Sequence, residues 1–408
     1  MIKGKILQDY AELIIKIGVN LQPEQGLEIA CPIEKSEFAV ELTKAAYKYG
    51  AKIVNVRWNC DQIDKLNYAN AKTETLTDIP KWLVNSKNYL VQNNFCYVAV
   101  SADDPEAFKD IPAQKLFEIS KAKSKALKKY SDCVMSNGIR WCVVSVPTSA
   151  WAKKVFPNQS DPEQCLSEQI EKAMRLNTEN PLLAWEEHIR VLEKRANFLN
   201  QQRFSYIHLK NAKGTDLMVG LCDGHIWTSA RELAKDGVPF MANMPTEEIF
   251  TAPHRLRVDG VLKSAMPLCV NGQIIDDFYI TFKKGKIVDY CANVGHGALK
   301  GLIETDKGTS RLGEIALIGK NSPIAKSNVL FYNTLFDENA SCHLAIGQGY
   351  TTTVKNGDKL TKKELLELGL NDSTEHEDFM IGTPDLSVVG IKENGEKITL
   401  FADGEWVI

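Results

Sequence analysis

The residues best suited to binding a metal ion are a histidine and an aspartate near the end of the chain. The segment NDSTEHEDFMIG places His376 two positions before Asp378. Side chains alternate along an extended strand, so these two would share one face, while Glu375 and Glu377 would face away. Imidazole nitrogen and carboxylate oxygen are the usual ligands of first-row metals. The segment therefore predicts a metal site, with an exposed acidic turn as the alternative.

Two acidic segments lie upstream of this pair. MPTEEIF places Glu247 and Glu248 between a proline and an apolar exit. Its alternative to metal binding is the start of a helix capped by Thr246, where acidic side chains are favoured. GTSRLGEIALIG places Glu314 directly before an apolar run. A buried carboxylate must be paired, solvated or bound to metal, and a glutamate at the surface edge is the alternative.

The segment FDENASCHLAIGQGY adds a second histidine to these acids. It contains Asp337, Glu338 and His343, and it ends at Tyr350 after a glycine-rich turn. Taken together, the four segments supply two histidines and several carboxylates, all from the second half of the chain. This mixture suits a two-metal hydrolytic site, in which carboxylates bridge the ions and a shared water becomes the nucleophile. From its own context Tyr350 fits a packing role better than a catalytic one.

The first half of the chain alternates helical and strand patterns. Residues 5–18 carry apolar side chains at three- and four-residue steps, which predicts an amphipathic helix. Strand-like runs such as GLEIAC, AKIVNVRW, CYVAVSA and RWCVVSVP alternate with helical segments. This order predicts an α/β N-terminal domain, with an open, mostly parallel sheet covered by helices on both faces.

The pattern changes near residue 200. The runs FSYIHLK, TDLMVGL, HRLRVDGVLK, DDFYITFKKGKIVDY and SNVLFY resemble short strands, and DG, NG and KKG punctuate them as hairpin turns would. We expect an α+β C-terminal domain rich in antiparallel strands. The predicted domains are an α/β domain over 1–200 and a metal-binding catalytic domain over 201–408.

Composition and charge exclude several classes of protein. The net charge is −3 with no basic run, so no nucleic-acid partner is expected. The ten cysteines include no C-x-x-C pair, which excludes a zinc ribbon and a thioredoxin-like pair. The N-terminus lacks a signal-peptide pattern and no apolar run reaches 18 residues, so no membrane association is expected. These features predict a cytoplasmic protein.

The four acidic segments, in this order, resemble the thermophilic aminopeptidase family, typified by aminopeptidase T and aminopeptidase S. The motifs are ANMPTEEIFTAP, RLGEIAL, LFDENASCHLAIGQGY and NDSTEHEDFMIG, and the similarity extends from the N-terminal helix to the ending LFADGEWVI. One departure is Glu377, which stands where the family usually has a hydrophobic residue. That position faces outward in a strand and should contribute no ligand.

The resemblance implies a metal-dependent aminopeptidase that hydrolyses the N-terminal residue of peptides through a two-metal-activated water. It implies two divalent ions per subunit (zinc, cobalt, manganese or magnesium), peptide substrates with a free N-terminus, and a homodimer. The catalytic residues would be Glu314 and Tyr350. We expect Glu314 and Asp378 to be the ligands shared between the ions and Tyr350 to donate a hydrogen bond to the oxyanion. The implied metal ligands are Glu248, Glu314, Glu338, His343, His376 and Asp378.

Three alternatives compete with this interpretation. NVGHGALKG (293–301) follows a strand-like run and nearly matches a dinucleotide fingerprint, which would indicate an NAD(P)-dependent dehydrogenase, but it lies outside the parallel half. A phosphoesterase would keep the metals, yet no glycine-rich phosphate loop or arginine cluster accompanies the acids. A binding protein whose ions only hold the fold is the third alternative.

Overall fold

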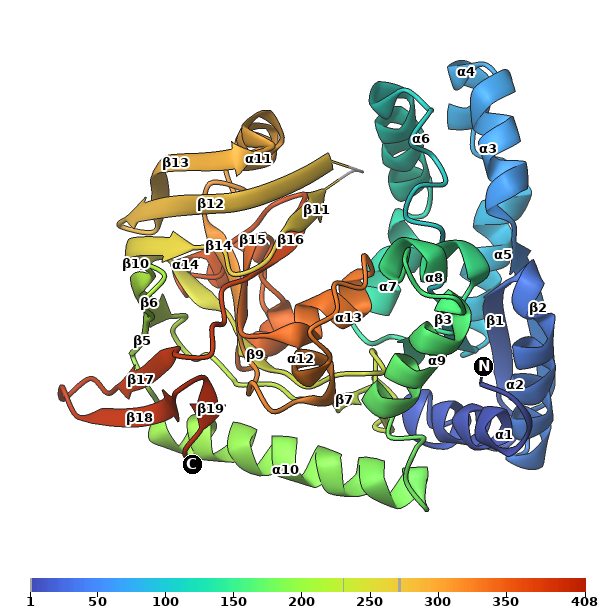
Figure 1. Cartoon of the computed structure of the whole chain (residues 1–408), viewed down its shortest axis with the longest axis horizontal. Helices are drawn as coiled ribbons and strands as arrows, with labels where there is room; N and C mark the ends of the chain where they lie inside the picture. Colours follow the sequence, from blue (N-terminus) through green and yellow to red (C-terminus); the bar gives the residue numbers. More distant parts are fainter. Residues whose placement is uncertain (1, 230, 271–272) are drawn as a thin grey trace. The chain divides into compact units, whose positions relative to one another are not determined.

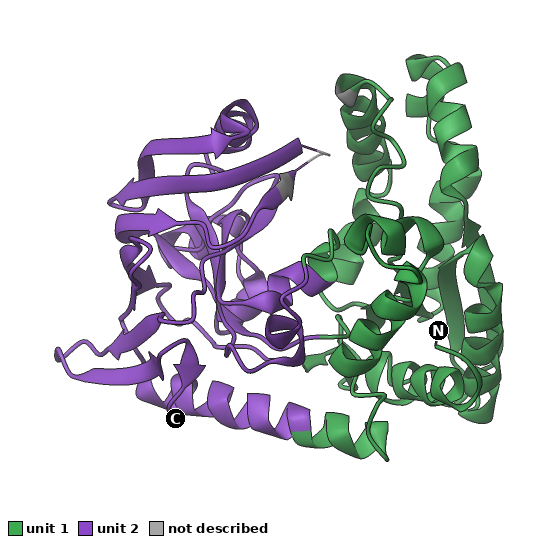
Figure 2. Cartoon of the chain, viewed as in Figure 1, with its two compact units in different colours: residues 1–187, 231–245, 330–335 green, residues 188–230, 246–329, 336–408 purple. Residues whose placement is uncertain are grey.

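The structure is a computed structural model that describes residues 2–229, 231–270 and 273–408. By its internal contacts the chain divides into two compact units, each made of three segments (Figure 2). Unit 1 consists of residues 1–187, 231–245 and 330–335, and unit 2 of residues 188–230, 246–329 and 336–408. The domain boundary at residue 200 stays a prediction. No helix in the described ranges combines the length and the hydropathy needed to cross a membrane.

Unit 1 is built around a parallel four-stranded sheet with the strand order β2-β1-β3-β4 (Figure 1). The predicted α/β organisation of this half is confirmed, because each strand-like run in the sequence forms one strand of this sheet. Its strands are β1 Gly26–Pro32, β2 Ile53–Asn59, β3 Cys96–Val100 and β4 Trp141–Val144. Its principal helices are α1 Gly4–Leu13, α2 Ser36–Lys48, α3 Asp61–Asn70, α4 Thr73–Thr77, α5 Lys81–Gln92, α6 Ala113–Ala126, α7 Lys128–Met135, α8 Ser149–Val155 and α9 Pro162–Ala173.

One face of the parallel sheet buries a charged pair. Glu28 of β1 lies beside Tyr97 of β3, and its carboxylate is 2.5 Å from the ammonium of Lys87 on α5. The same ammonium lies 4.9 Å from the centre of the Tyr97 ring and 5.3 Å from that of Tyr130 on α7. Burial lowers the pKa of Lys87, and the hydrogen bond that its ammonium donates to Glu28 opposes this effect. The charges of this cluster are therefore compensated within unit 1.

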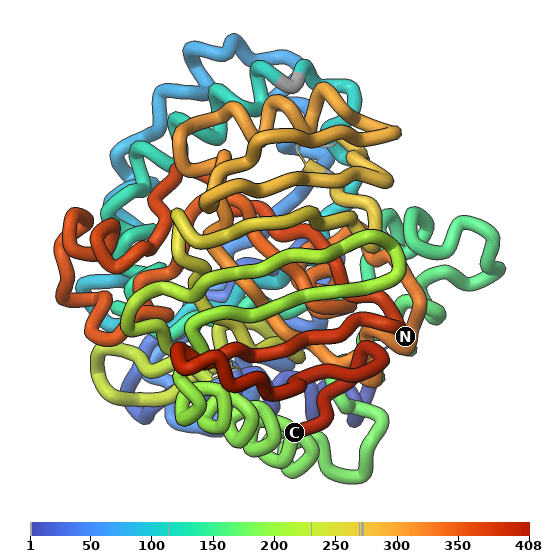
Figure 3. Tube along the Cα trace, turned by 90° about the vertical axis from the view of Figure 1, so that its left-hand side faces the viewer, coloured from blue at the N-terminus to red at the C-terminus, as the bar shows by residue number. Residues whose placement is uncertain are grey.

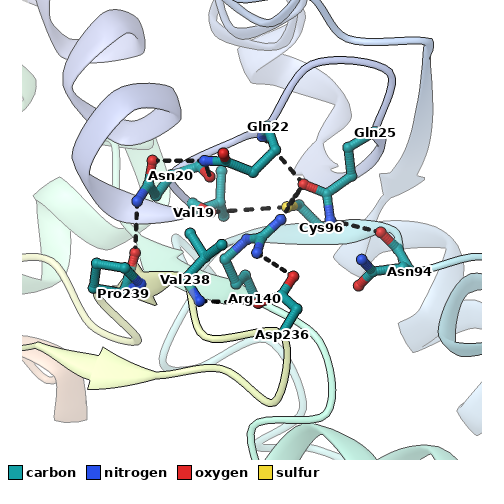
Figure 4. Close-up of polar contacts among 10 residues, drawn as sticks. All are labelled: Val19, Asn20, Gln22, Gln25, Asn94, Cys96, Arg140, Asp236, Val238 and Pro239. Atoms are coloured by element: carbon teal, nitrogen blue, oxygen red, sulfur yellow. Dashed lines mark hydrogen bonds and ion pairs between the residues drawn. The ribbon is translucent and has the colours of Figure 1, made fainter.

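A buried arginine fixes the segment 231–245 to the rest of unit 1 (Figure 4). Arg140 is 1% exposed and pairs with Asp236 at 2.5 Å, between β7 Glu232–Leu233 and β8 Pro239–Phe240. Its other terminal nitrogen donates a hydrogen bond to the side-chain oxygen of Gln25. The Asn20 amide adds a 2.8 Å hydrogen bond to the carbonyl oxygen of Pro239. The segment is thus anchored through the turn of its hairpin and the start of β8.

Unit 2 contains a large antiparallel sheet, which confirms the α+β expectation for the second half. Its strands lie side by side in the order β11-β12-β10-β6-β5-β17-β18-β19, with β13 paired to β12 (Figure 3). The KKG signal forms the β12–β13 hairpin, because Lys284 and Gly285 both adopt the positive φ of a tight turn. The strands are β5 Tyr206–Lys210, β6 Asp216–Leu221, β10 Pro253–Lys263, β11 Leu268–Val270, β12 Gln273–Lys283, β13 Lys286–Val294, β17 Ser387–Ile391, β18 Lys397–Ala402 and β19 Glu405–Trp406.

Some local expectations in this half were wrong. SNVLFY (327–332) is not a strand: Ser322 caps the short helix α12 Pro323–Ser327, and the chain then turns through Asn328 in a left-handed conformation. The DG signal is mixed: Asp403–Gly404 forms the turn between β18 and β19, whereas Asp259–Gly260 lies inside β10. The NG pair at 271–272 lies outside the described residues.

A second sheet of unit 2 carries the acidic motifs. It is antiparallel, with the order β16-β15-β14-β9, and its members come from four distant parts of the sequence. The strands are β9 Ile249–Thr251, β14 Leu312–Leu317, β15 His343–Gly347 and β16 His376–Met380. The remaining helices are α10 Pro181–Gln202, which spans both units, α11 His296–Ile303, α13 Thr334–Asp337 and α14 Lys362–Glu367.

Candidate metal centre

The register of the small sheet brings Glu314 and Asp378 onto one face. Both pair with Ala345 of the central strand β15, from opposite sides. Residues directly opposite each other in an antiparallel sheet project to the same face, so the two carboxylates flank the small Ala345 side chain. His343 and His376 each lie two positions earlier on their strands and therefore share this face. The prediction that His376 and Asp378 project together agrees with this register.

Glu248 reaches the same face from the far edge of the sheet. Phe250 of β9 pairs with Ala316, which pairs in turn with His343. Glu248 lies two positions before Phe250, in an extended segment. The predicted alternative, a helix start capped by Thr246, is wrong, because residues 246–248 form no helix.

The two histidines are oriented by backbone carbonyls. The Nδ1 atom of His376 lies 2.7 Å from the carbonyl oxygen of Gln348, and that of His343 lies 3.3 Å from the carbonyl oxygen of Ser341. A carbonyl oxygen only accepts, so Nδ1 is the donor in both rings. This arrangement turns each Nε2 toward the carboxylates, and a carbonyl behind the ring is typical of metal-binding histidines.

The Nε2 atoms lie among five oxygens of three carboxylates. His343 Nε2 is 3.3 Å from Glu248, 3.6 Å from Glu314 and 3.8 Å from Asp378. His376 Nε2 is 3.5 Å from Asp378 and 3.7 Å from Glu314. These contacts define two possible ion positions, one formed by Glu248, Glu314 and His343, the other by Glu314, His376 and Asp378. Within each group the ligand atoms lie within 4.8 Å of one another, and Glu314 belongs to both.

Glu338 and Tyr350 adjoin this cluster without belonging to either triad. Glu338 lies in the turn Glu338–Ala340 just before β15, and the negative charges of Glu248 and Asp378 act on its carboxyl. The Tyr350 ring lies 4.8 Å from that of His376, centre to centre, and 6.1 Å from that of Phe250. The structure therefore brings all seven predicted site residues to one face of the small sheet.

Burial and mutual repulsion make the cluster hold protons. Burial raises the pKa of Glu314 to about 7, although a hydrogen bond from His343 opposes this. Burial also raises the pKa of Glu338 well above its usual value, and neighbouring carboxylates add to the effect. Burial would lower the pKa of His376, but Asp378 and Glu314 raise it to about 10. A cation bound here would replace these protons, as metals do at acidic sites.

One oxygen atom of the cluster is suited to binding a cation. Asp378 Oδ1 is buried and has no hydrogen-bond partner among the residues described. Burial would raise the pKa of Asp378, but the positive charges of His376 and His343 keep it below its ordinary value, so the side chain stays ionised. A buried, ionised oxygen without a hydrogen bond is costly. Oxygen and imidazole donors on one buried face fit a divalent ion.

Sequence reasoning missed the side chains that support the ligands. Glu247 was weighed together with Glu248, yet its side chain lies 3.6 Å from His188 Nε2. Its backbone N–H donates a 2.8 Å hydrogen bond to the side chain of Asn339. Asp306 accepts hydrogen bonds from Ser373 and Thr374 ahead of β16. No local signal marks these residues, because their partners are distant in sequence.

The dehydrogenase alternative finds no support in this fold. NVGHGALKG does connect a strand to a helix, with Gly295 in a left-handed conformation before α11. The preceding strand β13 is antiparallel to β12, however, and dinucleotide sites require a parallel strand–helix–strand unit.

The sequence is similar to known peptidases over its whole length. A family described as thermophilic metalloprotease (M29) matches residues 3–406. Aminopeptidase AmpS of Bacillus subtilis (strain 168) is 40% identical over 402 residues, and aminopeptidase 2 of Geobacillus stearothermophilus is 39% identical over 404. Aminopeptidase T of Thermus aquaticus is 36% identical over 404 residues. Each alignment covers 98% of both chains.

Solved structures agree with these similarities. Wild-type AmpT from Thermus thermophilus superposes with a TM-score of 0.93 at 35% identity, covering 99% of each chain. A 2,5-dihydroxypyridine dioxygenase from Pseudomonas putida KT2440 shares only the fold, at 12% identity and a TM-score of 0.55. With the family matched along nearly all of its length, the chain belongs to the M29 family of thermophilic metalloproteases and is a metallo-aminopeptidase.

Proposed function

We propose that this enzyme removes the N-terminal residue of peptides at a centre of two divalent metal ions. The observation that carries the proposal is the position of Glu314, which belongs to both groups of possible ligands. A carboxylate shared in this way is typical of two-metal hydrolytic sites. The proposed ligands are Glu248, Glu314, Glu338, His343, His376 and Asp378.

The chemistry divides between the ions and the chain. Divalent ions, when bound, supply Lewis acidity that polarises a carbonyl oxygen and lowers the pKa of water. Glu314 would contribute a ligand to both ions, because it belongs to both groups of possible ligands. Tyr350 acts on the substrate: burial raises its pKa well above 10, with nearby carboxylates adding to the shift, so the phenol keeps its proton. Its O–H can donate to the oxyanion that forms when the peptide carbonyl is attacked.

The remaining assignments concern the setting of the enzyme. Its substrates are peptides, and we propose that they need a free N-terminus. We further propose zinc, cobalt, manganese or magnesium as the metal, a homodimer, a cytoplasmic location, and residues 201–408 as the catalytic domain. No nucleic-acid or membrane partner is proposed.

Metal analysis coupled to peptidase assays tests the proposal. The purified enzyme should contain about two divalent ions per chain and hydrolyse aminoacyl nitroanilides, and a chelator should abolish this activity reversibly. Peptides with a free α-amine should lose residues one at a time, while their N-acetylated forms resist. Full activity after complete metal removal would refute the metal centre, and internal cleavage of acetylated peptides would refute exopeptidase action.

A further inference from the structure

Asn339 occupies the junction between two of the proposed ligand segments. It lies in the turn Glu338–Ala340, directly after Glu338, and its exposed fraction is 0%. A fully buried carboxamide has to use its hydrogen-bonding groups, since leaving them unmet would destabilise the fold. Its partners therefore show what the residue is for.

The oxygen of this side chain holds the segment that leads to Glu248. Asn339 Oδ1 accepts a 2.8 Å hydrogen bond from the backbone N–H of Glu247, which is 92 residues earlier in the chain. On the other side, His188 Nε2 lies 2.8 Å from the carbonyl oxygen of Thr246. The backbone next to Glu248 is thus fixed from two sides.

The amide nitrogen of the same side chain points to the other ligand segment. Asn339 Nδ2 donates a hydrogen bond to Glu338 Oε1, at 3.4 Å. The Asn339 carboxamide therefore contacts the proposed ligand Glu338 directly. It also contacts Glu247, the neighbour of the proposed ligand Glu248. Glu248 and Glu338 are both partly buried, and their negative charges repel each other. An N–H donor at this point stabilises the ionised form of Glu338 and opposes that repulsion.

Only an amide supplies both functions here. The site needs an acceptor for the Glu247 N–H and a donor toward a carboxylate, and asparagine carries both on one short, stiff side chain. An aspartate would turn the second contact into repulsion between carboxylates. A leucine would fill a similar volume with neither group.

We propose that Asn339 is a positioning residue that sets Glu248 and Glu338 at the distance needed to receive a metal ion. The proposal rests on the proposed metal centre. It does not make Asn339 a ligand or a catalytic residue. Hydrogen-bonding partners behind metal ligands typically contribute about 10- to 100-fold to metal affinity or activity.

Cobalt titration of metal-free protein tests the assignment. Asn339→Leu should weaken cobalt(II) binding about 10- to 100-fold and alter the visible absorption of the bound ion, which reports its coordination geometry. Asn339→Ser is the second variant in case leucine prevents folding, because serine is small and polar yet too short to span both partners. Thermal unfolding of the metal-free variants measures any loss of folded protein separately.

Asn211→Leu is the matched control. Asn211 is also a buried asparagine with backbone partners, but its side-chain oxygen fixes the turn between β5 and β6 through Gly214 and Thr215. Its amide nitrogen reaches only the carbonyl oxygen of Ile381, at 3.4 Å, which follows β16 and adjoins none of the proposed ligands. It should lower stability and leave cobalt affinity unchanged. Wild-type affinity and an unchanged spectrum in both Asn339 variants would overturn the assignment.

A ligand variant separates this proposal from the metal centre itself. If His343→Ala loses cobalt binding while the Asn339 variants keep it, only the positioning role fails. If His343→Ala also binds cobalt normally, the proposed metal centre fails with it.

Discussion

Each unit of this enzyme buries a cluster of charged side chains, but only one cluster is neutralised by its own members. In unit 1 the carboxylate of Glu28 meets the ammonium of Lys87, and two tyrosine rings face the same cation. In unit 2 the carboxylates of Glu248, Glu314 and Asp378 share two histidines, and Asp378 keeps one buried oxygen without a hydrogen bond from any described residue. The two clusters are similarly buried, but they differ in how far their negative charges are matched by positive ones.

The difference shows which property of a buried cluster indicates function. A compensated pair can serve the fold alone, and replacing both partners by neutral groups is often tolerated. In a cluster rich in acids, bound protons reduce the repulsion between carboxylates. A positively charged ligand can bind there in place of those protons. Excess charge, more than burial, marks the site.

The largest expected effect comes from removing a ligand in unit 2. His343→Ala, His376→Ala or Asp378→Ala should reduce metal content and peptidase activity together, to background, because each removes a donor from the cluster. Metal analysis and nitroanilide hydrolysis on the same samples measure both. Full activity in any of these variants would exclude that residue from the centre.

Tyr350→Phe should separate binding metal from acting on substrate. The change removes a hydroxyl and keeps the ring beside His376, so both ions should stay bound. Loss of one oxyanion donor should lower kcat by about 10²- to 10³-fold and leave KM nearly unchanged. Normal kcat would mean that the tyrosine only packs, and loss of metal would mean that it supports the ligands.

A substitution in the compensated cluster of unit 1 should lower the stability of the protein and leave its activity unchanged. Lys87→Met leaves the carboxylate of Glu28 buried without its main partner, which should cost about 3–5 kcal/mol in the free energy of unfolding. Arg57, 3.9 Å from Glu28 and largely exposed, should offset little of this. Denaturant unfolding measures the loss, and activity per folded molecule should stay normal.

The double variant Glu28→Gln/Lys87→Met is the control for this cluster. Because it removes both charges, it should recover most of the lost stability. If Lys87→Met alone left stability unchanged, the cluster would not be compensated in the way described.

The smallest expected effect is a pH dependence confined to the metal-free enzyme. Protonated Glu314 stabilises the fold below pH 4.5, and this contribution is lost as the pH rises toward its folded pKa of about 7. Protonated His376 stabilises it below pH 6.5, and this is lost toward a pKa of about 10. The melting temperature of metal-free protein should therefore fall from pH 5 to pH 9. The metal-loaded enzyme should show a shallower fall, and equal slopes would contradict the linkage.

Local patterns allowed much of the architecture to be predicted. Strand periodicity places His376 and Asp378 on one face, because that relation depends only on two neighbouring positions. The change from an α/β pattern to an antiparallel-strand pattern can likewise be read from short stretches of sequence. SNVLFY failed because Ser322 and the following proline start a helix just upstream, and its apolar residues then pack without a strand partner.

The rest of the site depends on register between distant strands. Nothing in the sequence near Glu314 indicates that Ala345 will separate it from Asp378. The contact of Asn339 with the Glu247 backbone is likewise a tertiary event across 92 positions. The family motifs predict the ligands, but the residues that support them are brought together only by the tertiary fold.

The interleaving of the two units has a consequence for synthesis of the chain on the ribosome. Unit 1 includes residues 330–335, so it is not complete until more than three quarters of the protein has been made. The small sheet finishes later still, with β16 near the C-terminus. Translation adds roughly 5–20 residues per second, so the strands β9 and β14 wait several seconds for β16. Truncated chains should therefore lack both a finished first unit and a metal centre, and this ties peptidase activity to completed translation.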